Sequence, residues 1–507
     1  MNAGAAVADA GAARGLRDRA RRLWQSHPGV TGYPLLLALV WLSRPASWRE
    51  PISHDPGQYL YVGQTILDGG TPYADAANNK GPLLYLLFAA IKLTSGTSVA
   101  GMRITLAMLA ALAALAVAGY VARAAGRAAG VLAGASFAVL SSAVPLDGDY
   151  PNSTQLGAAP VAGAWYLATR PGPRFALAAG GATGAAVAMN VSLAVVAPFV
   201  AWELWRSAGD DGRVRRLALA AAGSLAVLAP LMLWIAFAGA LDDLWENVFE
   251  QIERVGGAAG VQARSAGGEL TDLHFLFNVP AGGLWAAGLL GACIAARERR
   301  LRAPAIASAL WILVSWLRVK TASYEFVQHY YPGLIGIVAG LALGVASLWG
   351  ARQRDRVALG ALVLVLAAWP YVVSQQFALL DLPPWQRGDP VMAEQAPVAA
   401  FVRANTGHSD RIQVAGSTAQ VYWLADRRAP TRWFDENSLR GRPDWARERG
   451  RLLLADPPQA VVALAPYQPE PDLAQVLSRR PYRLAYDVRG ARVWLLERGS
   501  EVTRTER

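Results

Sequence analysis

Blocks of about 15 to 25 mostly apolar residues, separated by short loops that contain arginine, recur along this chain up to about residue 380. An α-helix of that length crosses the roughly 30 Å hydrocarbon core of a bilayer. Hydrophobic residues make up 54% of the 507 residues, and charged residues only 17%. The pattern therefore predicts a polytopic α-helical membrane protein. The single cysteine excludes an intrachain disulfide.

The arginine clusters give the predicted helices a direction. The formal net charge is +11, and the positive-inside rule explains the basic loops as cytoplasmic without a nucleic-acid partner. The N-terminal tail 1–30 is then cytoplasmic and not a signal peptide, because no small-residue cleavage site follows its apolar segment. The basic loops are 123–127, 170–174, 206–216, 297–302 and 352–356.

A consistent topology has about eleven spans. Their expected positions are 31–47, 101–121, 128–145, 155–169, 174–190, 191–206, 217–239, 276–296, 303–317, 331–349 and 357–377. Because the number is odd, the C-terminus lies on the external side. The apolar block 83–95 is short and contains Lys92, and counting it as a span would move later basic loops to the wrong face. We therefore predict that it is a membrane-embedded or interfacial helix within the first external loop, 48–100.

The composition changes near residue 385, where lysine disappears and turn residues become frequent. Residues 31–380 are thus expected to form the transmembrane domain, and 381–507 an external, water-soluble α/β domain. Its predicted helices are 392–405, 444–455 and 471–478, and its predicted strands are 411–415, 459–465, 482–487 and 492–497. The domain has neither a G-x-G-x-x-G fingerprint nor a P-loop, so the sequence does not support nucleotide binding.

Acidic residues of the external segments are the best candidates for catalysis. The chain has no H-E-x-x-H zinc motif and no G-x-S-x-G nucleophile motif. Asp55 stands out because it follows the first span directly, where a charge at the membrane surface is costly. His54 to Gly57 is expected to break the chain, with a helix from Tyr59 to Leu67 after it. The other external acids are Asp68, Asp75, Asp147, Asp149, Asp242, Asp243 and Glu325.

Three sequence runs resemble one family. DPGQYL at 55–60, GGTPYAD at 69–75 and KGPLLY at 80–85 are similar to the first external loop of the membrane glycosyltransferases of the GT-C superfamily. Within that superfamily they resemble the bacterial relatives of protein mannosyltransferases and of the aminoarabinose transferase that modifies lipid A. HYYP at 329–332 and VAGSTAQVYWLADRRAPTR at 414–432 look like two further segments of these proteins.

The resemblance implies a reaction. Such enzymes take a hexosyl or pentosyl group from a polyprenyl-phosphate sugar, whose tail stays in the bilayer, and transfer it with inversion to a cell-envelope acceptor: a glycan, a lipid or a protein. By this hypothesis Asp55 is the general base, because a carboxylate within hydrogen-bond reach can accept the acceptor's hydroxyl proton. The candidates for binding the donor phosphate are Lys80, Arg318, Lys320 and His329. The expected substrate pocket contains His54, Tyr59, Tyr73 and Tyr330.

Two positions depart from the family pattern. Many relatives carry an acid shortly after an asparagine, whereas Asn152 is followed here by Ser-Thr-Gln. Either Asp147 or Asp149 supplies the second acid, or the enzyme needs only one carboxylate. Such a pair also suits a divalent cation or a plain turn. Asn190 stands where a lysine is common in relatives.

Two other classes of function stay open. A transporter or flippase of a lipid-linked or polar solute would use broken helices and polar groups inside the membrane, for which Asn190 is the main candidate. A noncatalytic scaffold would bind envelope partners through its C-terminal domain. The expected location is the plasma membrane of a bacterium, with the C-terminal domain external or periplasmic.

Overall fold

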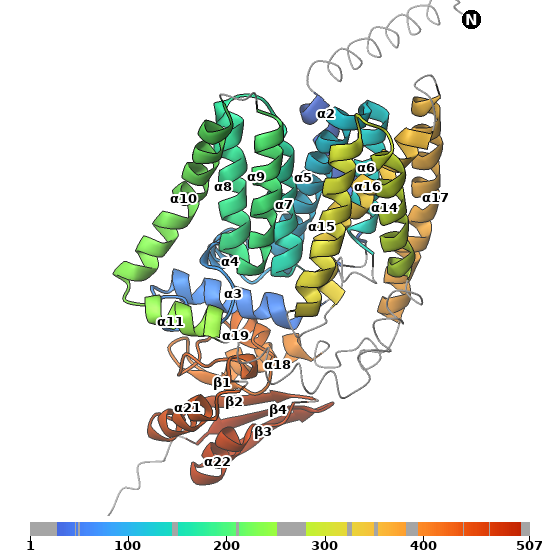
Figure 1. Ribbon diagram of the computed structural model, residues 1–507. Coiled ribbons are helices and arrows are strands. Elements are labelled where there is room, and N and C mark those ends of the chain that lie inside the picture. The colour runs from blue at the N-terminus through green and yellow to red at the C-terminus, as the bar shows by residue number, and fades with distance from the viewer. Residues whose placement is uncertain are drawn as a thin grey trace, which may run out of the picture.

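The computed structural model describes residues 28–45, 47–48, 51–143, 151–208, 212–250, 280–321, 327–348, 353–381, 394–439, 441–465 and 467–497. It consists of a helix bundle and, at one end of the bundle, a C-terminal part with a β-sheet (Figure 1). Helices α3 and α11 lie between these two parts (Figure 1).

The bundle is built from long apolar helices. Each of the eleven predicted spans coincides with a helix, and that all eleven cross the membrane stays a prediction. In the described part of the chain, four helices are long and apolar enough to cross a membrane, namely α5, α10, α15 and α17. The bundle helices are α2 (Pro28–Leu42), α5 (Val99–Ala125), α6 (Arg127–Leu140), α7 (Ser153–Ala168), α8 (Pro173–Met189), α9 (Val196–Arg206), α10 (Arg213–Phe237), α14 (Pro280–Ala296), α15 (Arg302–Thr321), α16 (Gly333–Leu348) and α17 (Arg354–Asp381).

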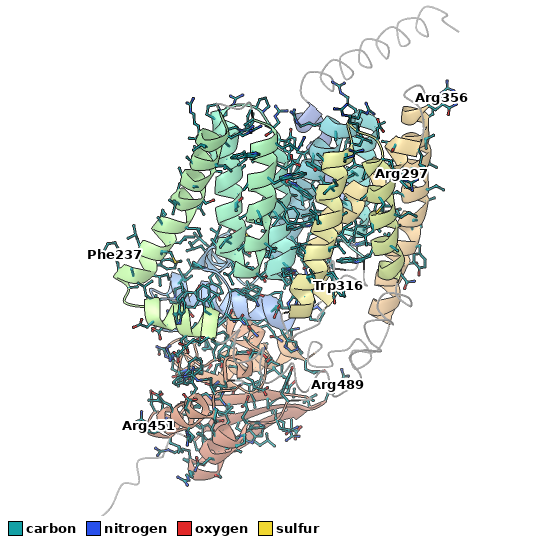
Figure 2. All side chains as sticks on the ribbon, in the orientation of Figure 1. Phe237, Arg297, Trp316, Arg356, Arg451 and Arg489 are labelled. Atoms are coloured by element: carbon teal, nitrogen blue, oxygen red, sulfur yellow. The ribbon has the colours of Figure 1, made fainter. Side chains whose placement is uncertain are left out.

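The two ends of the bundle differ in composition. Arg356 lies at the end away from the C-terminal part, whereas Phe237 and Trp316 lie toward it (Figure 2). The α5–α6, α7–α8, α9–α10 and α14–α15 connections carry the arginine clusters. The side predicted to be cytoplasmic is therefore the side opposite the C-terminal part.

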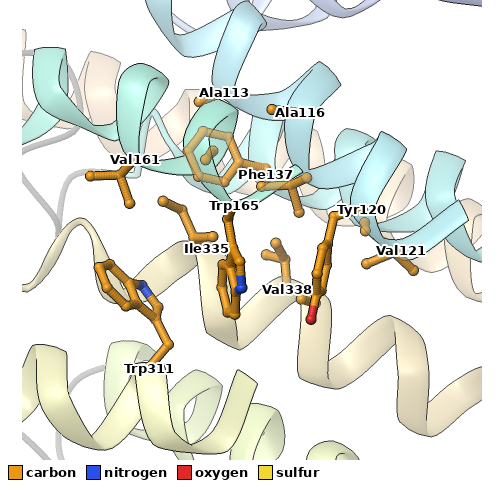
Figure 3. Close-up of a cluster of buried hydrophobic side chains, with 14 of the residues drawn as sticks. Ala113, Ala116, Tyr120, Val121, Phe137, Val161, Trp165, Trp311, Ile335 and Val338 are labelled. Carbon is orange, nitrogen blue, oxygen red and sulfur yellow. The ribbon is translucent and has the colours of Figure 1, made fainter. Parts of the chain in front are cut away.

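The middle of the bundle is packed with aromatic rings and small residues. Trp165 of α7 lies between Tyr120 of α5, at a ring distance of 4.9 Å, and Trp311 of α15, at 5.8 Å (Figure 3). Elsewhere the backbones approach closely, because a Cβ atom at Gly180 of α8 would lie only 1.8 Å from the Ala220 carbonyl oxygen of α10. Close backbone contacts of this kind are common between membrane helices.

The loop predicted to be the first external one contains α3 (His54–Leu67) and α4 (Pro82–Ser95). The prediction that His54 to Gly57 breaks the chain is wrong, since α3 already begins at His54. Pro56 is tolerated there because the first turn of a helix has no intrahelical partners for its N–H groups. The segment 83–95 forms α4 as expected, and its place at the membrane interface stays a prediction.

The segment 242–254 is only partly described. Its first part forms the short helix α11 (Leu241–Trp245), followed by one π-helical turn (Glu246–Glu250). Residues 251–254 lie outside the described residues.

The C-terminal part contains a four-stranded sheet in the order β1-β2-β4-β3. β1 runs parallel to β2, and the other neighbouring strands are antiparallel. The β3–β4 hairpin turns at Arg489 and Gly490, whose φ angles of 51° and 82° suit a tight hairpin turn. The strands are β1 (Ile412–Val414), β2 (Ala460–Leu464), β3 (Tyr482–Val488) and β4 (Ala491–Leu496). The helices are α18 (Gln395–Asn405), α19 (Gln420–Ala425), α20 (Glu436–Leu439), α21 (Pro443–Ala455) and α22 (Pro471–Arg479).

All the strands and helices predicted for this part are present, whereas the short helices α19 and α20 were not predicted. The boundaries of the predicted domains at residues 30 and 380 stay predictions.

Helix α3 and the C-terminal part share one apolar core. The ring of Tyr61 lies 4.7 Å from Tyr422 and 4.4 Å from Phe434. The two backbones are so close that a Cβ atom at Gly57 would lie 2.8 Å from the amide nitrogen of Gln420. The C-terminal part therefore packs directly against α3, where the predicted site residues begin.

Candidate functional site

Asp55 lies in the first turn of α3 and is half-buried. A helix N-terminus stabilises a negative charge at this position. One turn further on is Tyr59, whose pKa is raised by burial and then by the negative charge of Asp55. Ser153, at the start of α7, also interacts with the Tyr59 hydroxyl. Asp55 and Ser153 are thus both close to the buried Tyr59 hydroxyl, where the start of α3 meets the start of α7.

Lys80 is held by its backbone on both sides. The Tyr73 hydroxyl donates a 2.8 Å hydrogen bond to the Lys80 carbonyl, and the Lys80 N–H donates to the Tyr85 hydroxyl at 2.9 Å. Tyr73 itself has a φ of 72°, an uncommon conformation for a residue other than glycine. This stretch therefore has a defined shape, although it is a loop.

The neighbouring Gly81 fixes the loop against the end of α8. Its N–H donates to the Met189 carbonyl at 3.1 Å. A Cβ atom at this position would lie 2.1 Å from the Ala188 carbonyl oxygen. Only glycine allows this approach.

Lys80 interacts with both Asp55 and Arg318. Burial lowers the pKa of the Lys80 ammonium, the negative charge of Asp55 raises it, and the positive charge of Arg318 lowers it further. One carboxylate and two cations therefore share one partly buried space. The two cations outnumber the carboxylate, so the local charge favours an anion.

Arg318 comes from α15 and meets a break between α8 and α9. After α8 ends at Met189, Asn190 is extended, and a 3-10 turn (Val191–Val195) leads into α9. Arg318 Nη1 donates to the Ser192 hydroxyl at 2.8 Å, and its other terminal nitrogen donates to the His329 carbonyl. The guanidinium of Arg318 thus binds at the break between α8 and α9.

A chain of hydrogen bonds continues from Ser192 toward Asp55. The Ser192 hydroxyl donates to Asn190 Oδ1 at 2.8 Å, and Asn190 Nδ2 donates to the Ser153 hydroxyl at 3.0 Å. Ser153 also interacts with Tyr59. Elements far apart in sequence, α3, α7, the α8–α9 break and α15, therefore meet at one site.

Some predicted site residues point elsewhere. His54 contacts the Ser417 carbonyl through Nδ1, and its Nε2 lies 3.5 Å from the Tyr467 hydroxyl, so it faces the C-terminal part. The Tyr330 ring lies in an apolar cluster, 5.7 Å from Trp285. His329 reaches the site through its backbone carbonyl.

Three predicted residues are not placed in detail. Asp147 and Asp149 lie outside the described residues, and so does the side chain of Lys320, whose backbone belongs to α15. Within the described residues, no group of three or more His, Cys, Asp or Glu side chains is arranged to hold a metal ion.

Asn152 and Gln155, in the segment that lacks the expected acid, cap the N-terminus of α7. Asn152 Oδ1 accepts from the backbone N–H of Thr154 at 2.9 Å, and Gln155 Oε1 accepts from the N–H of Asn152 at 3.1 Å. This capping box starts α7 and thereby positions Ser153. Sequence reasoning missed Ser153 and Ser192, although the capping pattern of Asn152 and Gln155 could have indicated the helix start.

The arrangement of helices matches solved structures. The chain is similar to ArnT from Cupriavidus metallidurans bound to undecaprenyl phosphate, with a TM-score of 0.63 and 14% identity over 92% of this chain and 97% of that one. This chain has the GT-C fold. The GT-C fold is also seen in the Archaeoglobus fulgidus oligosaccharyltransferase in complex with Zn and sulfate. That structure matches with a TM-score of 0.54 and 16% identity over 85% of this chain and 67% of its own.

No protein-family model and no curated protein matches the chain. The resemblance expected from the runs at 55–60, 69–75 and 80–85 is thus confirmed through the GT-C fold and not through sequence similarity. The prediction of a mostly helical membrane protein is confirmed with it.

Proposed function

We propose that this protein is a membrane glycosyltransferase that moves a sugar from a polyprenyl-phosphate donor to a cell-envelope acceptor, with inversion. The observation that carries the proposal is that Lys80 lies within the electrostatic influence of both a half-buried carboxylate, Asp55, and a second cation, Arg318. The GT-C fold supports it, because ArnT has this fold and was solved with undecaprenyl phosphate bound.

In the proposed reaction, Asp55 accepts the proton of the acceptor hydroxyl as that oxygen attacks the anomeric carbon. The bond between the anomeric carbon and the phosphate oxygen breaks, and the polyprenyl phosphate leaves with one more negative charge than it had as a diester. Lys80 and Arg318 stabilise this developing charge. A single displacement inverts the anomeric centre, so one carboxylate is sufficient and neither Asp147 nor Asp149 has to act.

The membrane setting fits a lipid-borne donor. Its apolar tail remains between the helices and the bilayer, while its phosphate lies at the end of the bundle nearest the C-terminal part. The proposed location is the plasma membrane of a bacterium, with this end external or periplasmic. Hexosyl and pentosyl donors both fit the proposal.

The test is the substitution Asp55→Asn in a strain that lacks the natural gene copy. Loss of the envelope modification, together with accumulation of the unused lipid-linked sugar, is the expected result. Asp68→Asn is the matched control, because Asp68 lies at the other end of α3 and pairs at 2.6 Å with Arg428. Normal transfer by the Asp55→Asn protein would overturn the proposal.

One observation favours a second function, that of a transporter or flippase. The α8–α9 break, with Arg318 at its edge, is a discontinuous helix of the kind used in transporters. Proteoliposomes that contain the purified protein separate the two functions. A flippase moves a fluorescent polyprenyl-phosphate sugar across the bilayer without any acceptor, and a transferase does not.

A further inference from the structure

A row of buried polar side chains connects the C-terminal part with the Lys80 loop. Gln58 of α3 donates to Asp435 Oδ1 at 3.2 Å, and Asn78 donates to Gln58 Oε1 at 2.7 Å. Tyr85 of α4 donates to Asn78 Oδ1 at 2.6 Å and accepts the Lys80 N–H at 2.9 Å. Asp435, Gln58, Asn78 and Tyr85 are at most 6% exposed. We call these four residues the relay.

The donors of the relay all point the same way. Asp435 Oδ1 also accepts the backbone N–H of Asn437 at 2.9 Å, so it is an acceptor and the Gln58 amide must face it with Nε2. Gln58 Oε1 then accepts a hydrogen bond from the Asn78 amide, and Asn78 Oδ1 accepts one from the Tyr85 hydroxyl. Having donated its only proton, the Tyr85 oxygen can accept from Lys80. Aligned hydrogen bonds of this kind strengthen one another in a buried environment.

The relay ends at the backbone of Lys80. Within the described residues, no hydrogen bond or ion pair joins the Lys80 ammonium to another side chain. The Lys80 backbone, which the Tyr85 hydroxyl and the Tyr73 hydroxyl hold from either side, therefore fixes the point from which this side chain reaches the site. If Asp435 or Gln58 moved, Asn78 and Tyr85 would have to move to keep their hydrogen bonds, and the Lys80 backbone would move with them.

We propose that Asp435, Gln58, Asn78 and Tyr85 are positioning residues, through which the C-terminal part holds Lys80 against the donor phosphate. This inference rests on the proposed function, because it takes Lys80 as a ligand of that phosphate. It gives the C-terminal part a role in donor binding, although that part contributes only the far end of the relay.

The test measures binding of undecaprenyl phosphate to the full-length, detergent-solubilised protein by native mass spectrometry. Lys80→Met should weaken binding about tenfold, because a charge-assisted contact to phosphate is lost. Gln58→Leu, which cuts the relay, should weaken binding about three- to tenfold. Because Gln58 acts through Lys80, adding Gln58→Leu to the Lys80→Met protein should change binding less than about twofold.

Two further variants separate positioning from simple destabilisation. Asp435→Asn keeps an acceptor oxygen for Gln58 and should leave binding unchanged. Asp435→Leu removes that oxygen and should weaken binding as much as Gln58→Leu does. If the Gln58→Leu protein does not fold, Asp435→Leu takes its place in the test. Tyr61→Phe is the matched control, because it removes another hydrogen bond between α3 and the C-terminal part, from the Ala429 N–H at 2.9 Å. Any effect of Tyr61→Phe should be the same with Lys80 and with Met at position 80.

The outcomes are distinct. If Gln58→Leu and Lys80→Met weaken binding additively, or if neither Gln58→Leu nor Asp435→Leu weakens it, the positioning role is overturned and the proposed function stands. If the wild-type protein does not bind undecaprenyl phosphate at all, the proposed donor class is overturned and the inference falls with it.

Discussion

Arg318 Nη1 donates a 2.8 Å hydrogen bond to the hydroxyl of Ser192, and this contact joins α15 to the break between α8 and α9. The Ser192 hydroxyl in turn donates a 2.8 Å hydrogen bond to Asn190 Oδ1. The lysine expected from the resemblance is absent at position 190, and here a guanidinium from another helix reaches the same break. The position of the Arg318 guanidinium near the proposed donor phosphate therefore depends on Ser192.

Ser192→Ala should remove one of the hydrogen bonds that hold the Arg318 guanidinium, while the bond to the His329 carbonyl remains. Hydrogen bonds to charged groups contribute about 1.5–3 kcal/mol, so we expect donor binding to fall by about one order of magnitude. Ser192→Thr keeps the hydroxyl and is the control. Titration with undecaprenyl phosphate measures the effect, and equal affinities of the alanine and threonine variants would contradict the assigned role.

Gly81→Ala should disturb the Lys80 loop. The new Cβ would lie 2.1 Å from the Ala188 carbonyl oxygen, and this backbone atom cannot turn away as a side chain could. Overpacking of this kind costs about 1–3 kcal/mol, so both the melting temperature and the transfer rate should fall.

Gly163→Ala is the matched control for this substitution. Gly163 lies in α7, and apart from its chain neighbours and the backbone of its own helix, no atom of the described residues lies within 4 Å of the Cβ position. Thermal unfolding and transfer should both stay near wild type in this variant. A Gly81→Ala protein that behaves like Gly163→Ala would show that the loop does not need the close contact.

The contact between α3 and the C-terminal part should depend on apolar packing more than on ion pairs. Tyr61 is buried between Tyr422 and Phe434, and its truncation to alanine should cost about 3–5 kcal/mol. Arg428 pairs with Asp68 at 2.6 Å, but both side chains are partly exposed. Arg428→Ala should therefore cost at most about 1 kcal/mol. Thermal unfolding of the two variants compares them, and a larger loss for Arg428→Ala would contradict this ranking.

The helices of the bundle could be predicted because their signal is local. A long apolar block between arginine clusters is visible in any window of the sequence, and the same holds for the β3–β4 hairpin at Arg489 and Gly490. The start of α3 was missed because Pro56 and Gly57 are helix breakers in the interior of a helix, whereas the first turn accepts them.

The site could be predicted only in part, for a related reason. Asp55 was indicated by its place after the first span, and Lys80 by a motif in the same loop. Ser192 and Asp435 carry no local signal, because their roles come from partners such as Arg318 and Gln58, which lie 126 and 377 residues away in the sequence. Contacts over such separations are decided by packing, which one sequence does not display.

Asp435 should make the stability of the protein depend on pH. Burial raises its pKa from 3.8 to about 7, while His54 lowers it and Glu436 and Glu470 raise it. Between these two pH values the folded protein keeps a proton that the unfolded chain releases, so stability is lost as the pH rises from about 4 to 7. Thermal unfolding from pH 5 to 8 measures this loss.

Asp435→Asn imitates the protonated carboxyl and cannot release a proton. At pH 5 the variant and the wild type should melt at similar temperatures, which serves as the internal control. At pH 8 the variant should be the more stable of the two, because the wild type then holds a buried carboxylate whose Oδ2 has no hydrogen-bond partner within the described residues. A constant difference between the two melting curves across this range would show that Asp435 does not titrate with a raised pKa.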